Sequence, residues 1–160
     1  MSRTEYTLDT SIAVKWFLKE EDSDKAKDLL NRHEAKEIEL FVPDLLLIEL
    51  ANVLHYSKCY QSEELANVLH YNRCYGSDEI TKIVTDVRQN LSVILLNDQI
   101  IDKALYLSTK FEVPVYDTVF LAVAVQSDRP LITADERMYR KLDAETAANV
   151  ILLSKWHCQD

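Results

Sequence analysis

Short apolar runs alternate with longer helical patterns along almost the whole chain. The apolar runs are rich in Leu, Ile and Val, and they predict strands at 6–8, 40–42, 92–96, 130–133 and 149–153. The segments between them carry helical patterns, at 11–18, 22–35, 45–54, 77–90, 98–111, 116–127 and 135–142. This alternation predicts a mainly parallel central sheet of about five strands with helices on both faces, a three-layer α/β/α fold.

The length and charge of the chain limit its organisation. Its 160 residues predict a single domain over 1–160. No apolar run is long enough to span a membrane, the start lacks the apolar stretch of a secretory signal, and three cysteines suggest no disulfide framework. We therefore expect a cytoplasmic protein without a membrane partner. The net charge of −9 counts against a nucleic-acid partner, unless bound cations reverse the sign locally.

Gly76 is the only glycine in the chain. Glycine-rich phosphate loops need several glycines, because the backbone must approach the phosphates closely. The sequence therefore argues against an enzyme that binds a nucleotide cofactor through a glycine-rich loop.

One segment of 15 residues occurs twice in tandem. Residues 49–63 (ELANVLHYSKCYQSE) and 64–78 (ELANVLHYNRCYGSD) are identical at 11 positions. We interpret this as a duplication inserted into a helical region of a standard fold. The insert is expected either to extend one helix or to add a helical hairpin.

Acidic residues follow four of the predicted strands. The carboxyl ends of parallel strands are where ligands bind in such sheets, which draws attention to Asp9 and Asp135. Asp44 and Asp98 each precede a helix, so we expect them to cap it.

Two further acids stand in apolar segments. Glu49 is the only charge in LLLIELANVL, where Asn52 shares its helix face, and Asp117 is the only charge in VPVYDTVFLAVAV. A carboxylate in such surroundings needs either a basic partner, for which Lys15 and Arg129 are candidates, or a metal ion.

Four converging carboxylates with few bases predict a site for Mg²⁺ or Mn²⁺, which prefer oxygen ligands. A metal-bound water could then hydrolyse a phosphodiester. Side chains near the acids could support the ligands from a second shell: the amide of Asn52 and the hydroxyl groups of Thr10, Ser11, Thr118 and Thr133.

Four segments resemble the signature blocks of PIN domains, in the family's order: 8–18, 41–54, 113–125 and 129–142. The resemblance spans nearly the whole chain and is strongest to VapC-like toxins of type II toxin–antitoxin systems. It implies a PIN-like fold and a Mg²⁺ or Mn²⁺ endoribonuclease site formed by Asp9, Glu49, Asp117 and Asp135. It also implies an RNA substrate, a small cognate antitoxin and a homodimer. The duplication offers Glu64 as an alternative to Glu49, although Glu49 keeps the family's lead-in FVPDLLLI.

Two other interpretations of the fold stay open at this point. One is a phosphatase or receiver-like domain that is phosphorylated on Asp9, although position 11 is Ser where such a phosphatase carries a second acid. The other is a module that binds RNA or a partner, in which the insert has disabled catalysis.

Overall fold

The computed structural model describes residues 3–57 and 75–157, and the part of the chain that it describes contains one parallel sheet. Its strands are β1 (Thr4–Leu8), β2 (Ile38–Pro43), β3 (Ser92–Ile94), β4 (Leu131–Thr133) and β5 (Val150–Leu152). The order across the sheet is β3-β2-β1-β4-β5, and every neighbouring pair is parallel. The prediction of a parallel sheet of about five strands is confirmed.

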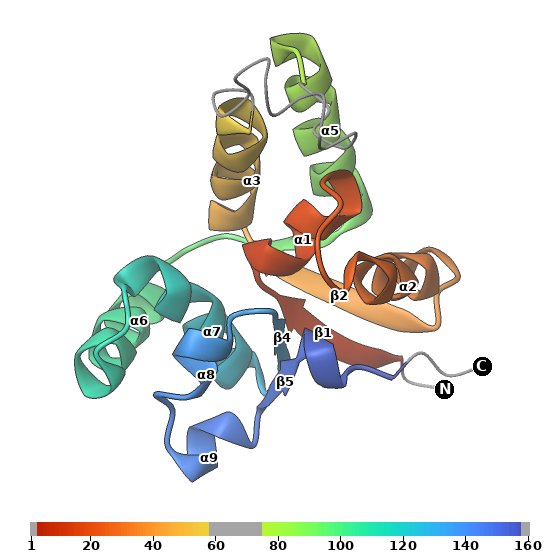
Figure 1. Cartoon of the computed structure of the whole chain (residues 1–160). Coiled ribbons are helices and arrows are strands. Elements are labelled where there is room, and N and C mark those ends of the chain that lie inside the picture. Colours follow the sequence, from red (N-terminus) through yellow and green to blue (C-terminus); the bar gives the residue numbers. More distant parts are fainter. Residues whose placement is uncertain (1–2, 58–74, 158–160) are drawn as a thin grey trace, which may run out of the picture.

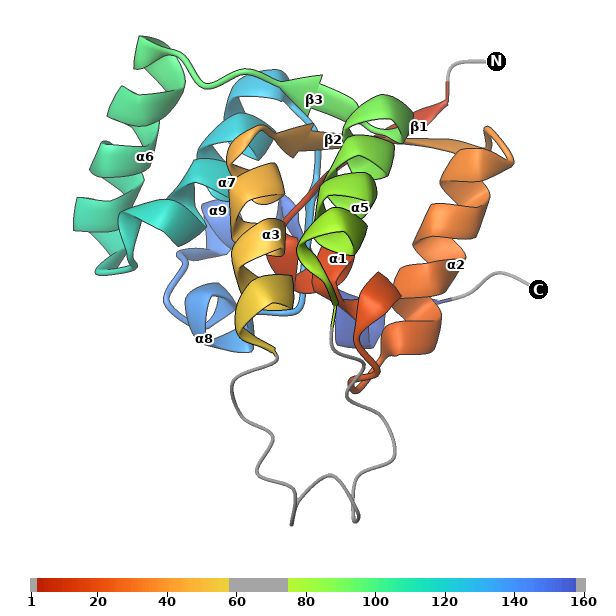
Figure 2. The ribbon, with the colours of Figure 1, turned by 90° about the horizontal axis from the view of Figure 1, so that it is seen from above.

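Helices cover both faces of this sheet. They are α1 (Thr10–Phe17), α2 (Ser23–Glu34), α3 (Leu45–Tyr56), α5 (Ser77–Asn90), α6 (Asp98–Phe111), α7 (Val115–Ser127), α8 (Glu136–Tyr139) and α9 (Ala144–Ala147), with a 3₁₀ turn at Leu153–Lys155. Crossovers between parallel strands are right-handed, so connections that run in opposite directions across the sheet place their helices on opposite faces. Accordingly, α1, α2, α3 and α5 lie on one side, and α6 to α9 on the other (Figures 1 and 2). The predicted three-layer α/β/α fold is confirmed.

The central helix α7 lies in the core. It contacts β1, β2 and β4 on one side and α6 on the other. Its residues 118–124 are all buried, which explains why its sequence is apolar all round. By contrast, α6 buries a single stripe, and its other faces are exposed.

Helix caps differ from the sequence predictions in two places. Asn97, not Asp98, caps α6, since its side chain accepts a hydrogen bond from the backbone N–H of Ile100 at 3.0 Å. Asp44 occupies the position before α3, but its carboxylate accepts from the N–H of Leu96 at 3.3 Å instead of from its own helix. Capping preferences cannot separate Asn97 from its neighbour Asp98, since both are good capping residues, and they do not foresee that the Asp44 carboxylate accepts from a backbone donor outside its helix.

Most of the duplication falls outside the described residues. The first copy begins within α3 and is described as far as Ser57; from the second copy, residues 75–78 are described and lead into α5. Whether the insert extends a helix or adds a hairpin therefore stays open, and so does the position of Glu64. Among the helices of 3–57 and 75–157, none is long and apolar enough to cross a membrane.

Candidate active site

The sheet has a topological switch point between β1 and β4. The chain leaves β1 toward β2 on one side and leaves β4 toward β5 on the other. Helices that follow the two strands depart in opposite directions, so a crevice opens at their carboxyl ends. Asp9 directly follows β1, and Asp135 comes two residues after β4. The two predicted strand-end acids therefore lie at the position where parallel sheets bind their ligands.

Asp9 is held from two sides and is only 9% exposed. One carboxylate oxygen accepts a hydrogen bond from the backbone N–H of Ser11, which makes Asp9 the cap of α1. The other oxygen accepts from the hydroxyl of Thr133, the last residue of β4. The Asp9 carboxylate thus has a fixed orientation, because one of its oxygens is bonded to α1 and the other to β4.

The same threonine also positions Asp135. The Thr133 hydroxyl oxygen accepts from the backbone N–H of Asp135 at 2.9 Å. The Oδ1 atom of Asp135 then accepts from the N–H groups of Arg137 and Met138, at 2.8 and 2.9 Å, and so caps α8. One carboxylate oxygen of Asp135 is engaged in this cap, and the structure places the residue at the cavity wall described below.

Glu49 and Asp117 reach the crevice from opposite faces of the sheet. Glu49 lies on α3, where its Oε2 atom accepts a hydrogen bond from the hydroxyl of Thr10 at 2.5 Å. Asp117 lies in the first turn of α7. Both side chains are half-buried. Four acids from four separate segments are thereby gathered at one end of the sheet.

The acids are close enough for their charges to raise the pKa of Asp9, Glu49 and Asp117. Burial raises the pKa of the Asp117 carboxyl above its usual range, and the charges of Asp135 and Asp9 raise it further. Burial likewise raises the pKa of Glu49, with contributions from Asp9 and Asp117. The pKa of Asp9 is raised by burial, against hydrogen bonds from Ser11 and Thr133 that lower it, and by Asp135. Within residues 3–57 and 75–157, these acids form a cluster of negative charge that no basic side chain pairs with.

Neither predicted basic partner pairs with these acids. The Lys15 ammonium lies 3.0 Å from the carboxylate of Glu20. The Arg129 guanidinium pairs with Glu5 and lies over the ring of Phe41, 3.8 Å from its centroid. Structural ion pairs with Lys15 or Arg129 therefore do not explain Glu49 and Asp117.

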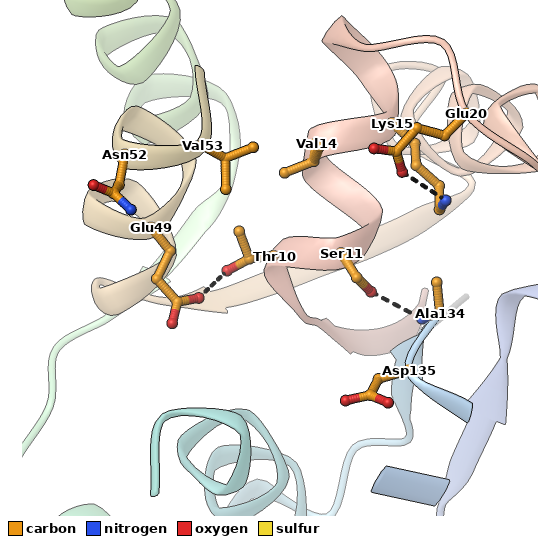
Figure 3. A pocket seen from close by; sticks show the side chains of 10 residues that line it. All are labelled: Thr10, Ser11, Val14, Lys15, Glu20, Glu49, Asn52, Val53, Ala134 and Asp135. Atoms are coloured by element: carbon orange, nitrogen blue, oxygen red, sulfur yellow. Dashed lines mark hydrogen bonds and ion pairs between the residues drawn. The ribbon is translucent and has the colours of Figure 1, made fainter. Parts of the chain in front are cut away.

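A cavity of about 640 Å³ opens beside the cluster. Figure 3 shows Glu49 and Asn52 of α3 on one side, Lys15 and Glu20 on the other, and Thr10 and Ser11 of α1 between them. Ala134 and Asp135 complete the wall, together with Val14 and Val53. Asp9 and Asp117 are not part of this lining, so only Glu49 and Asp135 of the four acids line the cavity.

The donors fit a hard divalent cation in their chemistry. They are carboxylate and hydroxyl oxygens, and none of the acids is neutralised by one of the predicted bases. Within residues 3–57 and 75–157, however, no three acidic, histidine or cysteine side chains stand close enough together to hold a metal ion as placed. Binding would therefore require rotation of half-exposed side chains such as Glu49 and Asp117 toward the fixed Asp9.

The predicted supporting residues have different positions. Thr10 and Thr133 each donate to a site carboxylate, and Ser11 supports Asp9 through its backbone and accepts from the N–H of Ala134 at 2.9 Å. Asn52 is exposed and lines the cavity one turn beyond Glu49. The hydroxyl of Thr118 instead donates to the carbonyls of Ala104 and Val115, both at 2.9 Å, so the prediction for this residue is wrong.

Sequence reasoning missed Glu20 as a residue of this cavity. The acidic stretch that contains it reads as the solvated start of α2. Its pairing with Lys15 spans five residues across a turn, a spacing that produces no helical pattern.

Comparison with known proteins gives a consistent result. The sequence pattern of the PIN domain family matches residues 6–144. No curated protein sequence matches the chain significantly. A structure described as a toxin–antitoxin complex from Klebsiella pneumoniae is similar, with a TM-score of 0.58, 16% identity, and coverage of 92% of this chain and 97% of the other. VapBC2 from Rickettsia felis, bound to a DNA fragment from its promoter, gives a TM-score of 0.59, 18% identity, and coverage of 93% and 97%. FitAcB from Neisseria gonorrhoeae has a TM-score of 0.54 and 15% identity, and the match covers 92% of this chain and 95% of the other.

Proposed function

The chain belongs to the PIN domain family, and from this premise we propose that it is an endoribonuclease that depends on Mg²⁺ or Mn²⁺. One observation carries the proposal: four carboxylates from separate segments lie near the switch point, and no basic side chain among residues 3–57 and 75–157 forms an ion pair with them. A cluster of this kind is costly unless a cation neutralises it.

In this proposal the chain's own residues hold and orient the ion. Asp9 is the fixed ligand, because Thr133 and Ser11 hold both of its oxygens in place. Glu49, Asp117 and Asp135 would complete the set, with Thr10 orienting Glu49. An ion held there would supply positive charge for the phosphodiester and would lower the pKa of a bound water molecule. We choose Glu49 because it lies close enough to Asp9 and Asp117 for their charges to raise its pKa, and because it keeps the lead-in FVPDLLLI; Glu64 lies outside the described residues and stays an alternative.

We further propose that the protein is the toxin of a toxin–antitoxin pair, acting in the cytoplasm as a homodimer. The support for the toxin is the likeness in fold to the protein from Klebsiella pneumoniae whose structure is described as a toxin–antitoxin complex. The partner in that case is a small cognate antitoxin.

The experiment is cleavage of end-labelled RNAs in Mn²⁺ or Mg²⁺, compared with EDTA. Asp9→Asn is expected to lower the rate by more than about a hundredfold, because even residues that only support metal ligands cost ten- to a hundredfold. Asp86→Asn, which removes an exposed acid from α5, is the matched control and should leave the rate unchanged. Activity that survives EDTA or Asp9→Asn would contradict the proposal.

One observation favours a second candidate, a binding module without catalytic activity: the described acids are not yet grouped closely enough to hold an ion. Complete inactivity of the intact protein on varied RNAs, with RNA binding retained, would support this candidate. Deletion of residues 49–63 or 64–78 would then test whether the duplication has disabled the site.

A further inference from the structure

Lys15 is a buried base in the wall of an otherwise acidic cavity. Its side chain is 10% exposed, and it is the one basic residue among the described residues that line the cavity. The charged residues that share the wall are Glu20, Glu49 and Asp135. A polyanion that enters such a cavity is repelled by three carboxylates and attracted by one ammonium group.

The Lys15 ammonium has unused hydrogen-bonding capacity. An ammonium group carries three N–H donors. Among the described residues, only Glu20 accepts one of them, at 3.0 Å. Two donors are therefore left for water or for a ligand in the cavity (Figure 3).

Glu20 does not need Lys15 to hold its place. Its backbone N–H donates to the hydroxyl of Ser23 at 2.8 Å, and that hydroxyl donates to the carbonyl of Leu18 at 3.3 Å. Phe17, which precedes Leu18, is also held in place: its carbonyl accepts a hydrogen bond from the phenol of Tyr75 at 2.8 Å. Because these contacts fix the turn between α1 and α2, the ion pair is not required to shape it.

We propose that Lys15 binds a phosphate group of the RNA backbone in this cavity, and that Glu20 occupies its ammonium group while RNA is absent. This inference rests on the proposed ribonuclease function. The phosphate is a suitable competitor, because it offers several anionic oxygens to the ammonium donors that Glu20 leaves unused. Lys15 is then a substrate-binding residue, and Glu20 weakens RNA binding by competing for it.

The experiment measures RNA binding without cleavage. A short fluorescent single-stranded RNA is titrated with protein in EDTA, at several KCl concentrations. Lys15→Gln is expected to weaken binding by about tenfold, the effect of losing one hydrogen bond to a charged group. It should also make the slope of log K against log[KCl] shallower by about 0.7, the value for one phosphate contact on a single strand.

Glu20→Gln is expected to have the opposite effect and tighten binding by about two- to fivefold, because it releases Lys15 from a partly exposed ion pair. In the double variant this gain should disappear, because the two residues act on each other. Lys15→Arg keeps the charge and should keep the salt slope.

The matched control is Lys25→Gln. Lys25 also pairs with an acid, Asp22, at 3.1 Å, but it is not part of the cavity lining. Its removal changes the net charge by the same amount and should leave the slope nearly unchanged.

A purely structural role for Lys15 predicts a different pattern. Lys15→Gln and Glu20→Gln would then lower the melting temperature while both leave RNA affinity and salt slope unchanged, and this result would overturn the inference. Cleavage of RNA by the native protein in Mn²⁺ is measured in parallel. Cleavage together with an unchanged slope refutes only the role of Lys15, whereas the absence of both cleavage and RNA binding refutes the proposed function and this inference with it.

Discussion

Asp117→Asn should stabilise the protein in metal-free buffer. The substitution removes one negative charge from a cluster in which burial, Asp135 and Asp9 already raise the pKa of the Asp117 carboxyl. Asparagine has nearly the same shape, and no hydrogen bond from the described residues to the Asp117 carboxylate is lost. The variant therefore reports on charge with little disturbance of packing.

The expected gain follows from the like-charge repulsion. Two unit charges about 6 Å apart repel by about 0.7 kcal/mol at the dielectric constant of water, and by about 3 kcal/mol at an effective value of about 20. Asp117 is half-buried, so repulsion from Asp135, Asp9 and Glu49 together should cost about 1–2 kcal/mol after solvent screening. For a chain of this size, 1 kcal/mol shifts the melting temperature by about 2–4 °C, which gives an increase of about 2–8 °C.

The assay is thermal unfolding in EDTA, followed by circular dichroism at low and high KCl. Salt screens the repulsion, so the gain should shrink as KCl is raised. Added Mn²⁺ should reverse the order, because the native protein binds the ion more tightly and a ligand at 100 times its Kd stabilises by about 2.7 kcal/mol. Asp86→Asn is the control and should shift the midpoint little. A melting temperature for Asp117→Asn at or below that of the native protein in EDTA would refute the reasoning.

Three further predictions concern carboxyl groups and their hydrogen-bond or ion-pair partners. In EDTA, the three site carboxyls whose pKa is raised bind more protons in the folded than in the unfolded protein. They should therefore add stability as pH is lowered from 7 toward their ordinary values of 3.8 and 4.5, and a flat thermal midpoint over this range would contradict the prediction. Thr133→Val removes the hydroxyl that donates to Asp9 and accepts from Asp135; it should lower the unfolding free energy by about 1–3 kcal/mol and reduce cleavage, measured by urea unfolding and RNA assay. The Lys110 ammonium lies 2.6 Å from the Asp143 carboxylate and lowers the pKa of Asp143 to about 2. An NMR titration of Asp143 should therefore have its midpoint near 2, and the midpoint should move upward in Lys110→Gln.

The elements were largely predictable because local periodicity determines them. The boundaries of α5 and α6 match the predicted 77–90 and 98–111, since each carries a clear polar and apolar face. The strand predicted at 92–96 ends at Ile94 because no further residues pair with β2 beyond Pro43. The short helix α9 has no buried residue, so it leaves no apolar pattern in the sequence to detect.

Parts of the site depend on tertiary contacts that the sequence does not encode locally. The apolar settings of Glu49 and Asp117 marked both residues, and the structure brings both to the crevice. The partners of Lys15 and Arg129 were not predictable, because long basic side chains reach acids on several elements and only the fold selects among them. The cap of α6 was misassigned by one residue because Asn97 and Asp98 are both good capping residues, and the sequence alone does not choose between them.

The hydrogen bond between Thr133 and Asp9 joins positions 124 residues apart in the chain. The two side chains meet only because β4 pairs with β1 in the sheet. In the proposed nuclease, a chain in which β4 has not joined the sheet would lack both Asp135 and the threonine that orients Asp9. Formation of the sheet and assembly of the site would then be a single event, so unfolding of β4 alone would abolish activity.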